Sequence, residues 1–247
     1  MCCHVIYVIR TAGRGRTGAR GPSGDTSTTV FSRPKQKLGE KEIEEHSFSG
    51  MATAASWKPL LLRALDSNAH LKHSTFFQLA TIGSNGRPSN RTVVFRGFQE
   101  DTNEIQINTD RRSAKIEEIK HCHFGEICWY FTESWEQFRI NGKIDIIDGA
   151  NSDACKLQHR EKAWFASSLK SRLQYLAPAP RLPDISNGSG EENQLDPSEG
   201  PVEAFCLLLF DPEQVDYLNL KSNERFIFTS RSSEQGFKVW MSEKVNP

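Results

Sequence analysis

The sequence predicts a mainly β fold, in which antiparallel strands close or nearly close into a barrel and a few helices lie at its periphery. Six or more short segments rich in β-branched and aromatic residues follow one another along the chain. The clearest hairpin turn is Ser84–Arg87, whose Asn-Gly pair separates two such segments. No G-x-G-x-x-G motif follows a predicted strand, which argues against a parallel nucleotide-binding sheet.

The composition is that of an ordinary soluble protein, with 25% charged and 37% hydrophobic residues and a formal net charge of zero. No apolar run approaches the ~20 residues that a membrane span needs, so we expect no membrane partner. The six cysteines form no C-x-x-C pair, which argues against a zinc ribbon or a redox motif and for reduced thiols. After residue 50 acidic side chains slightly outnumber basic ones. Because nucleic-acid affinity depends on cations that neutralise phosphates, we expect no nucleic-acid partner.

Residues 1–50 are predicted to be a disordered extension, because they offer no apolar periodicity and too little hydrophobic surface to offset the entropy of ordering. Met51 is the preferred hypothesis for the functional start, and 1–50 would then be non-native or dispensable. The Arg-rich, acid-poor beginning also resembles an organellar transit peptide. We therefore expect a cytoplasmic protein, or a plastid one if residues 1–50 are a genuine targeting segment.

The folded domain is expected over residues 51–247. Hydrophobic residues at helical spacing predict helices, and alternating β-branched and aromatic residues predict strands. The expected helices are one capped by Ser56, one at 113–122 and one at 152–176. The expected strands are 76–83, 89–98, 105–108, 124–132, 135–147, 205–210, 215–220, 225–229 and 237–240. A Pro/Gly/Ser/Glu-rich loop at 178–201 is expected to be mobile.

Polar side chains gather at the ends of these predicted strands. Arg91 and Arg96 lie an odd number of residues apart on one strand, so a regular strand would point them to opposite faces. Asn108 and Thr109 end the next strand, and Ser113 and Lys115 open the helix after it. A helix N-terminus with Ser113, Lys115 and Arg91 is a reasonable phosphate cradle. Gln137, on a later strand, can donate and accept hydrogen bonds at once, which suits the edge of a heterocycle.

Four stretches of this sequence together resemble the pyridoxine/pyridoxamine 5′-phosphate oxidase family of FMN-binding split barrels. They are Arg-Thr-Val-Val-Phe-Arg-Gly-Phe from Arg91, Asn-Thr-Asp-Arg-Arg-Ser-Ala-Lys from Asn108, Trp-Glu-Gln-Phe-Arg-Ile-Asn-Gly from Trp135, and the terminal Trp-Met-Ser-Glu-Lys-Val-Asn-Pro. The resemblance runs from about Trp57 to Pro247 and is greatest to the divergent plant-type members. It implies a six-stranded antiparallel split β-barrel and a homodimer with FMN at the interface.

The resemblance also implies site residues. The segment of Arg91, Thr92, Val93 and Val94 would line the flavin, and Arg96 stands where the family usually has a lysine that touches flavin and substrate. The phosphate would be bound by Thr109, Ser113 and Lys115, although Ala114 replaces a basic residue. Gln137 would bond the isoalloxazine ring, and Arg225 would lie near the flavin.

The substrate side departs from the family pattern. The late Arg-x-His pair has no counterpart in residues 219–224, and Leu218 replaces an aromatic residue that covers FMN. A helix that carries tyrosine, arginine and serine for the substrate phosphate is only loosely matched by His159, Arg160 and Ser167. Candidate catalytic residues are therefore Arg96, His159, Arg160 and Lys221.

The activity that the resemblance implies is oxidation of pyridoxamine or pyridoxine 5′-phosphate. A hydride would pass from the C4′ carbon to flavin, and O2 would reoxidise the flavin and release peroxide. Three alternatives remain open: a split-barrel flavoprotein with a different reductase activity, a non-catalytic binder of FMN or B6 vitamers, and a binding or structural role without any flavin. A metal site at His121-Cys122-His123 is disfavoured, because neighbouring helical residues point in different directions. We therefore expect no metal.

Overall fold

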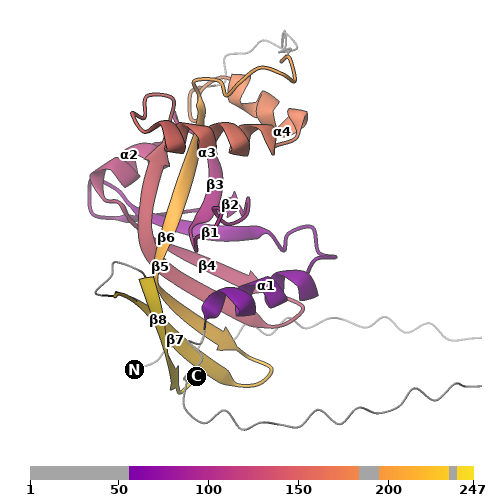
Figure 1. Ribbon diagram of the computed structural model, residues 1–247, viewed down its shortest axis with the longest axis vertical. Helices are drawn as coiled ribbons and strands as arrows, with labels where there is room; N and C mark the ends of the chain where they lie inside the picture. Colours follow the sequence, from indigo (N-terminus) through magenta and orange to yellow (C-terminus); the bar gives the residue numbers. More distant parts are fainter. Residues whose placement is uncertain (1–55, 184–194, 234–237) are drawn as a thin grey trace, which may run out of the picture. The chain divides into compact units, whose positions relative to one another are not determined.

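The computed structural model describes residues 56–183, 195–233 and 238–247, all of which belong to one compact unit, Gly50–Pro247 (Figure 1). The extension predicted at 1–50 and the proposed start at Met51 lie outside the described residues. Within the described part of the chain, no helix is long and apolar enough to cross a membrane.

Every pairing between neighbouring strands is antiparallel. The strands are β1 (Phe76–Ile82), β2 (Pro88–Val94), β3 (Ile105–Asp110), β4 (Phe124–Phe131), β5 (Glu136–Ile147), β6 (Phe205–Asn219), β7 (Glu224–Ser232) and β8 (Lys238–Val245). Their order is β2-β1-β4-β5-β6-β7-β8, and β3 also pairs with β6. The predicted hairpin is present, with β1 and β2 paired on either side of the Asn-Gly turn.

Six of the eight strands described form the barrel, in the order β2-β1-β4-β5-β6-β3. The barrel closes between β3 and the segment that follows β2 in the chain. The backbone N–H of Arg96 donates to the carbonyl of Gln106 over 3.0 Å, and the N–H of Gln106 donates to the carbonyl of Gly97 over 2.9 Å. This narrow closure agrees with the antiparallel split barrel expected from the sequence.

Strand β6 is one strand rather than the two predicted at 205–210 and 215–220, and that prediction was wrong. Its first half lies between β3 and β5, and its second half lies between β5 and β7. The change of neighbour coincides with a register shift between Asn141 and Gly142 of β5. A Cβ atom at Gly142 would collide with the carbonyl oxygen of Asp211, so close backbone contact at the bulge requires glycine there.

Two hydrophobic cores follow from the alternation of side chains along these strands. The first fills the barrel and includes Phe77, Leu79, Ile127 and Ile140, all with no exposed surface. Trp57 of α1 (Trp57–Ser67) belongs to it, so this helix covers one end of the barrel. The second lies on the outer side of β6, beneath the helices that follow β5.

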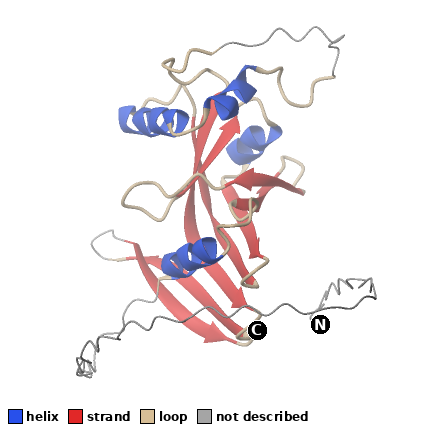
Figure 2. Ribbon diagram, turned by 90° about the vertical axis from the view of Figure 1, so that its right-hand side faces the viewer, coloured by secondary structure: helices blue, strands red, loops and turns tan. Residues whose placement is uncertain are grey.

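Helices lie around the strands (Figure 2). After α2 (Ala114–His121), the helix predicted at 152–176 is three shorter elements, so its prediction as one helix was wrong. They are α3 (Ala154–Phe165), α4 (Leu169–Leu173) and the 3₁₀ turn η1 (Gln174–Leu176). The break follows from Ser168, whose hydroxyl accepts a hydrogen bond from the N–H of Ser171 and so caps α4.

Part of the loop predicted at 178–201 is anchored to these helices. Leu195 is buried in the second core. The indole N–H of Trp164 donates to the carbonyl of Glu199 over 2.8 Å, and the guanidinium of Arg172 donates to the carbonyl of Pro197 over 2.9 Å. Residues 195–199 are therefore fixed by side chains of α3 and α4.

Candidate functional site

A cluster at the start of α2 brings together three of the predicted phosphate-binding residues. The ammonium of Lys115 donates to the hydroxyl of Thr109 over 2.8 Å and to the hydroxyl of Ser113 over 2.9 Å. Ser113 is the N-cap residue of α2, yet its side chain makes no capping bond within the described residues. The first N–H groups of α2 are thus not satisfied by their cap. Burial, and then the charge of Arg91, lower the pKa of Lys115.

Arg91 completes this cluster, which we call the phosphate cradle: Arg91, Thr109, Ser113 and Lys115. The Arg91 guanidinium donates to the carbonyls of Leu79 (3.2 Å) and Ser89 (3.1 Å). It also donates to the hydroxyl of Thr81 and the carboxylate of Glu118, each over 2.5 Å. Since Arg91 pairs with the fully buried Leu79 in the β1–β2 register, its side chain lies on the core side of β2.

A pocket of about 270 Å³ lies between β3 and α3, and it contains two further predicted residues. Arg96 and Asn108 line it, together with Ser167 near the end of α3. The side-chain amide of Asn108 donates to the hydroxyl of Ser167 over 3.0 Å. Its oxygen is buried and has no hydrogen-bond partner among the described residues, which is unusual for a buried polar atom.

The remaining predicted flavin residues lie elsewhere on the sheet. Four of them lie on the outer face of the sheet, which is the face turned away from the barrel core: Thr92, Val94, Gln137 and Arg225. Along each strand, these residues and their register partners alternate with the buried residues of the barrel. The Arg225 guanidinium binds both carboxylate oxygens of Asp216, over 2.8 and 2.6 Å. Val93, by contrast, packs against the barrel core.

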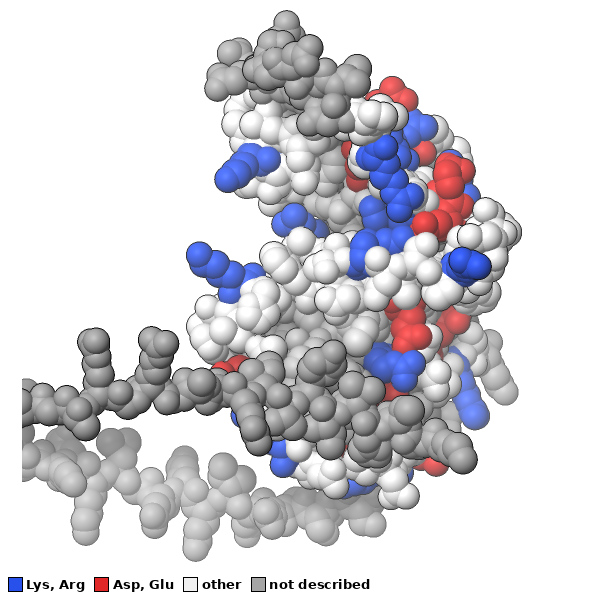
Figure 3. All heavy atoms as spheres, turned by 180° about the vertical axis from the view of Figure 1, so that it is seen from behind, with Lys and Arg blue, Asp and Glu red and all other residues white. Residues whose placement is uncertain are grey.

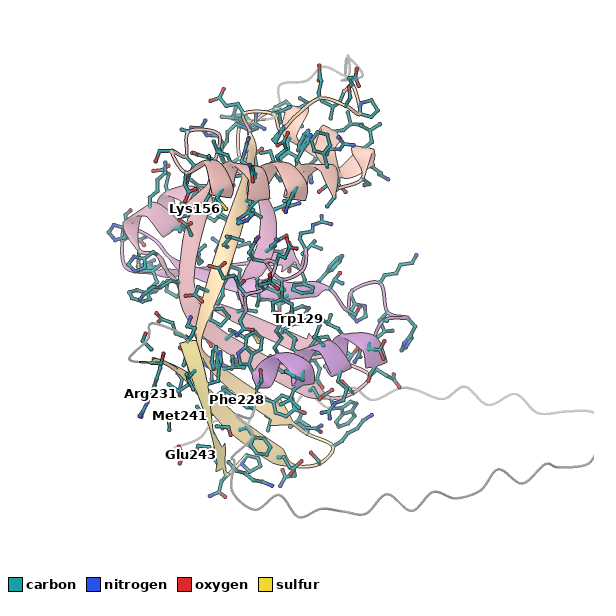
Figure 4. All side chains as sticks on the ribbon, viewed as in Figure 1. Trp129, Lys156, Phe228, Arg231, Met241 and Glu243 are labelled. Atoms are coloured by element: carbon teal, nitrogen blue, oxygen red, sulfur yellow. The ribbon has the colours of Figure 1, made fainter. Side chains whose placement is uncertain are left out.

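The outer face also carries exposed aromatic side chains. Phe76 is 45% exposed and Tyr130 is 42% exposed. On the neighbouring strands, Phe228 points towards α1, whereas Met241 and Glu243 point to the other side of the sheet (Figure 4). On the face shown in Figure 3, basic and acidic side chains are mixed on the right of the view, whereas several basic side chains on the left stand apart from acidic ones.

None of the three candidate catalytic residues other than Arg96 lines the pocket of Arg96, although His159 lines an adjoining hollow that shares Gln106, Ala163 and Ala166 with it. The His159 imidazole Nε2 lies 3.7 Å from the Sγ of Cys155, one turn earlier on α3, and His159 lines a neighbouring acidic hollow. The Lys221 ammonium donates to the carbonyl of Glu133 over 2.7 Å, at the end of β6 remote from β3.

Arg160 is buried. Its guanidinium donates to the carbonyls of Phe205 (3.0 Å) and Val202 (2.7 Å) and lies over the Phe205 ring. Arg160 therefore stabilises the fold by connecting α3 to the start of β6. Its position does not support contact with substrate.

Sequence reasoning did not single out Glu118 and Thr81, which hold Arg91. Glu118 lies three residues after Lys115, a spacing that puts two side chains on one side of a helix. That spacing could have suggested that the carboxylate faces the cradle. Thr81 offered no comparable signal, because its partner lies across a hairpin.

Fold and site together define a flavin-binding split barrel, and comparisons with known proteins place the chain in a family. A family model described as "Pyridoxamine 5′-phosphate oxidase, FMN-binding domain" matches residues 54–148. The chain is 62% identical over 193 residues to pyridoxine/pyridoxamine 5′-phosphate oxidase 2 of Arabidopsis thaliana, covering 78% of this chain and 98% of the relative. The chain therefore belongs to the pyridoxine/pyridoxamine 5′-phosphate oxidase family.

Solved structures agree with this assignment. A pyridoxamine 5′-phosphate oxidase-related, FMN-binding protein from Nostoc punctiforme PCC 73102 is 42% identical, with a TM-score of 0.72, covering 78% of this chain and 98% of that one. PhzG from Burkholderia lata 383 has a TM-score of 0.56 at 18% identity, covering 77% of this chain and 92% of that one, and shows the shared fold alone.

FMN is accordingly the cofactor of this chain, and the residues present fit it. Lys115 and Arg91 supply the cations, and Thr109 and Ser113 the hydroxyls, that a phosphate monoester needs. The unsatisfied start of α2 adds N–H donors.

Proposed function

We propose that this protein catalyses the FMN-dependent oxidation of pyridoxamine or pyridoxine 5′-phosphate to pyridoxal 5′-phosphate, with O2 as the acceptor. The observation that carries the proposal is the pocket of Arg96, Asn108 and Ser167, which is linked to the phosphate cradle by the consecutive β3 residues Asn108 and Thr109. The similarity to a named pyridoxine/pyridoxamine 5′-phosphate oxidase over nearly that protein's whole length supports it.

The cradle would bind the FMN phosphate through Arg91, Thr109, Ser113 and Lys115. Asn108 is adjacent in sequence to Thr109 but points to the other side of β3. The β3 strand therefore separates a cofactor phosphate on its inner side from a substrate on its outer side. Arg96, and Ser167 opposite it, would hold the anionic end of the substrate.

Bound FMN supplies the capacity to accept two electrons from the substrate and pass them to O2. The residues of this chain orient the substrate and provide positive charge. The Asn108 oxygen, buried and unpartnered within the described part of the chain, would accept a hydrogen bond from the substrate. Such fixed positioning accounts for a large part of the rate enhancement in reactions of this kind.

A second copy of the chain would complete the flavin site. The exposed Phe76 and Tyr130 lie on the same face as Gln137 and Arg225. Covering this face would bury the aromatic side chains and bring Gln137 and Arg225 against a flavin held by the other copy. We therefore propose a homodimer with FMN at the interface.

The test is anaerobic mixing of the FMN-loaded full chain with pyridoxamine or pyridoxine 5′-phosphate, while the absorbance of oxidised flavin is followed. We expect bleaching that recovers on admission of air, with pyridoxal 5′-phosphate formed. Arg96→Met should raise KM by roughly tenfold or more, since a charged hydrogen bond to an anion contributes about 1.5–3 kcal/mol. Lys221→Met, which changes a cation remote from the pocket, should leave KM unchanged.

One observation favours a second candidate, a flavoprotein of the same fold with a different substrate. Residues 220–223, near the place of the family's Arg-x-His pair, form the β6–β7 turn, where Lys221 bonds a backbone carbonyl. Bound flavin that never bleaches with either B6 vitamer would discard the oxidase reaction and leave this candidate.

A further inference from the structure

Glu118 of α2 places a carboxylate in direct contact with the cradle. One of its carboxylate oxygens accepts hydrogen bonds from the Arg91 guanidinium and from the Thr81 hydroxyl, both over 2.5 Å. Its side chain is 13% exposed, and that of Arg91 is 22% exposed. The pair is thus largely withdrawn from water, where an ion pair is screened less than at the surface.

Two opposite roles for this carboxylate are physically conceivable. A negative charge on Arg91 could compete with the flavin phosphate for the same cation. Alternatively, it could hold the guanidinium in the orientation that the phosphate requires. The two roles predict opposite changes in FMN affinity when the charge is removed.

The contacts favour orientation. One terminal nitrogen of Arg91 is already bound to Leu79, Ser89 and Thr81, and the other is bound to Glu118, so the guanidinium is fixed at both ends. Displacing Glu118 would also leave the Thr81 hydroxyl, which is 1% exposed, without an acceptor for its proton. A buried polar group that loses its partner costs free energy, so this carboxylate is poorly suited to exchange with an incoming ligand.

The charges of the cradle also favour an orienting role for Glu118. Lys115 and Glu118 are three residues apart on α2, and Arg91 lies close enough to Lys115 to lower the pKa of its ammonium. Two cations held together for one phosphate repel each other in the absence of that phosphate. The Glu118 carboxylate is bonded to Arg91 and lies close enough to Lys115 to oppose the lowering of the pKa of its ammonium, so it reduces this repulsion.

We infer that Glu118 is a positioning residue for the flavin phosphate: it fixes the Arg91 guanidinium and holds Arg91 and Lys115 together. The inference rests on the proposed placement of that phosphate in the cradle.

The test compares FMN with riboflavin, which lacks the phosphate, in titrations of the cofactor-depleted full chain followed by flavin fluorescence. Glu118→Gln should weaken FMN binding about tenfold, on the scale of one charged hydrogen bond, and leave riboflavin binding within about twofold. The neighbouring Glu117, which is exposed and pairs with Lys120, gives the matched control. Glu117→Gln should change neither affinity.

Tighter or unchanged FMN binding in Glu118→Gln would overturn the inference, and so would equal losses of FMN and riboflavin. If that variant does not fold, Glu118→Asp carries the test, because it keeps the charge but cannot reach Arg91 in the same way. It should show a smaller loss that is still specific to FMN, and no such loss would overturn the inference.

Lys115→Ala separates this inference from the placement on which it rests. It should weaken FMN but not riboflavin, by about 100-fold on the scale of a partly buried ion pair. A Lys115→Ala protein with no phosphate-specific loss would show that the phosphate binds elsewhere. A phosphate-specific loss in Lys115→Ala without one in Glu118→Gln would leave the placement intact and reject the role of Glu118.

Discussion

The phosphate cradle and the outer face of the sheet differ in how complete they are within one chain. In the cradle, Lys115 and Arg91 are held by hydrogen bonds of 2.5 to 3.2 Å to hydroxyls, carbonyls and a carboxylate. On the outer face, Gln137 lies on an open strand surface beside the exposed Tyr130. One region is organised before any ligand arrives, whereas the other presents side chains to whatever covers it.

The two regions would therefore bind different parts of the cofactor. A phosphate is small and strongly charged, so a preorganised set of cations and N–H groups in one chain can bind it. A flat ring system needs protein surface against both of its faces, and the outer face of one copy can cover only one of them. We therefore expect phosphate affinity to depend on the cradle alone and ring affinity to depend on association of two copies.

The bulge at Gly142 lies where β6 passes from β3 to β7, and changing it should have the largest effect. Gly142→Ala would force a methyl group against the carbonyl of Asp211 and the Phe210 ring, at a cost of about 3 kcal/mol for overpacking. The melting temperature should fall by roughly 5–10 °C. Gly149→Ala is the control, since a Cβ atom there meets its nearest neighbour at an ordinary 3.7 Å. Equal melting temperatures for both variants would contradict the role of the bulge.

The outer face can be tested by adding charge to it. Tyr130→Glu should weaken the proposed homodimer about 100-fold, because each copy would bring an uncompensated carboxylate into the interface. Sedimentation velocity over a range of concentrations measures this change. Leu62→Glu alters a side chain of similar exposure, 46%, on α1 and should not change the dimer. A Tyr130→Glu protein that dimerises normally would place the interface elsewhere.

The sequence predicted those features that depend on short stretches of chain. The β1–β2 hairpin followed from Asn85-Gly86, and the grouping of Thr109, Ser113 and Lys115 followed from seven consecutive residues. The break after α3 was missed because the residues around Ser168 carry no glycine or proline. The continuity of β6 was missed because Pro212 suggests a break, although a residue without an N–H is tolerated where the ladder is already irregular.

The long-range contacts could not be predicted in the same way. Arg91 and Glu118 are 27 residues apart, and only the barrel topology brings them together. Arg160 illustrates the converse, because its charge suggested an anion site. Its surroundings show instead that it serves two backbone carbonyls. Charge alone does not tell whether a cation serves a ligand or the fold.

The cradle should also show a dependence on alkaline pH that the outer face lacks. Burial and then Arg91 lower the pKa of Lys115 below its ordinary value of ~10.4. FMN affinity should therefore fall as pH rises through that lowered pKa, by up to about tenfold per pH unit. Lys115→Arg, whose guanidinium stays protonated, should remove this loss, and riboflavin affinity should not follow it. Fluorescence titrations at a series of pH values measure both.

The same lowered pKa has a consequence for stability. Between the folded pKa of Lys115 and its ordinary value, the unfolded chain binds more protons than the folded chain. The free energy of unfolding of the cofactor-free protein should therefore increase with pH in that window. Denaturant titrations of the cofactor-free protein measure it. A slope that persists in Lys115→Arg would assign the effect to another group.

A substitution of Gln137 should have the smallest effect, and it distinguishes binding of the flavin ring at the outer face from binding of the phosphate in the cradle. Gln137→Leu removes a neutral hydrogen-bonding group from the outer face and should weaken FMN about fivefold, the scale of one neutral hydrogen bond. Unlike a change in the cradle, it should weaken riboflavin equally, because both ligands share the ring. Titration of both flavins measures the ratio of the two losses. A loss confined to FMN would mean that Gln137 acts on the phosphate, and the division between cradle and outer face would then fail.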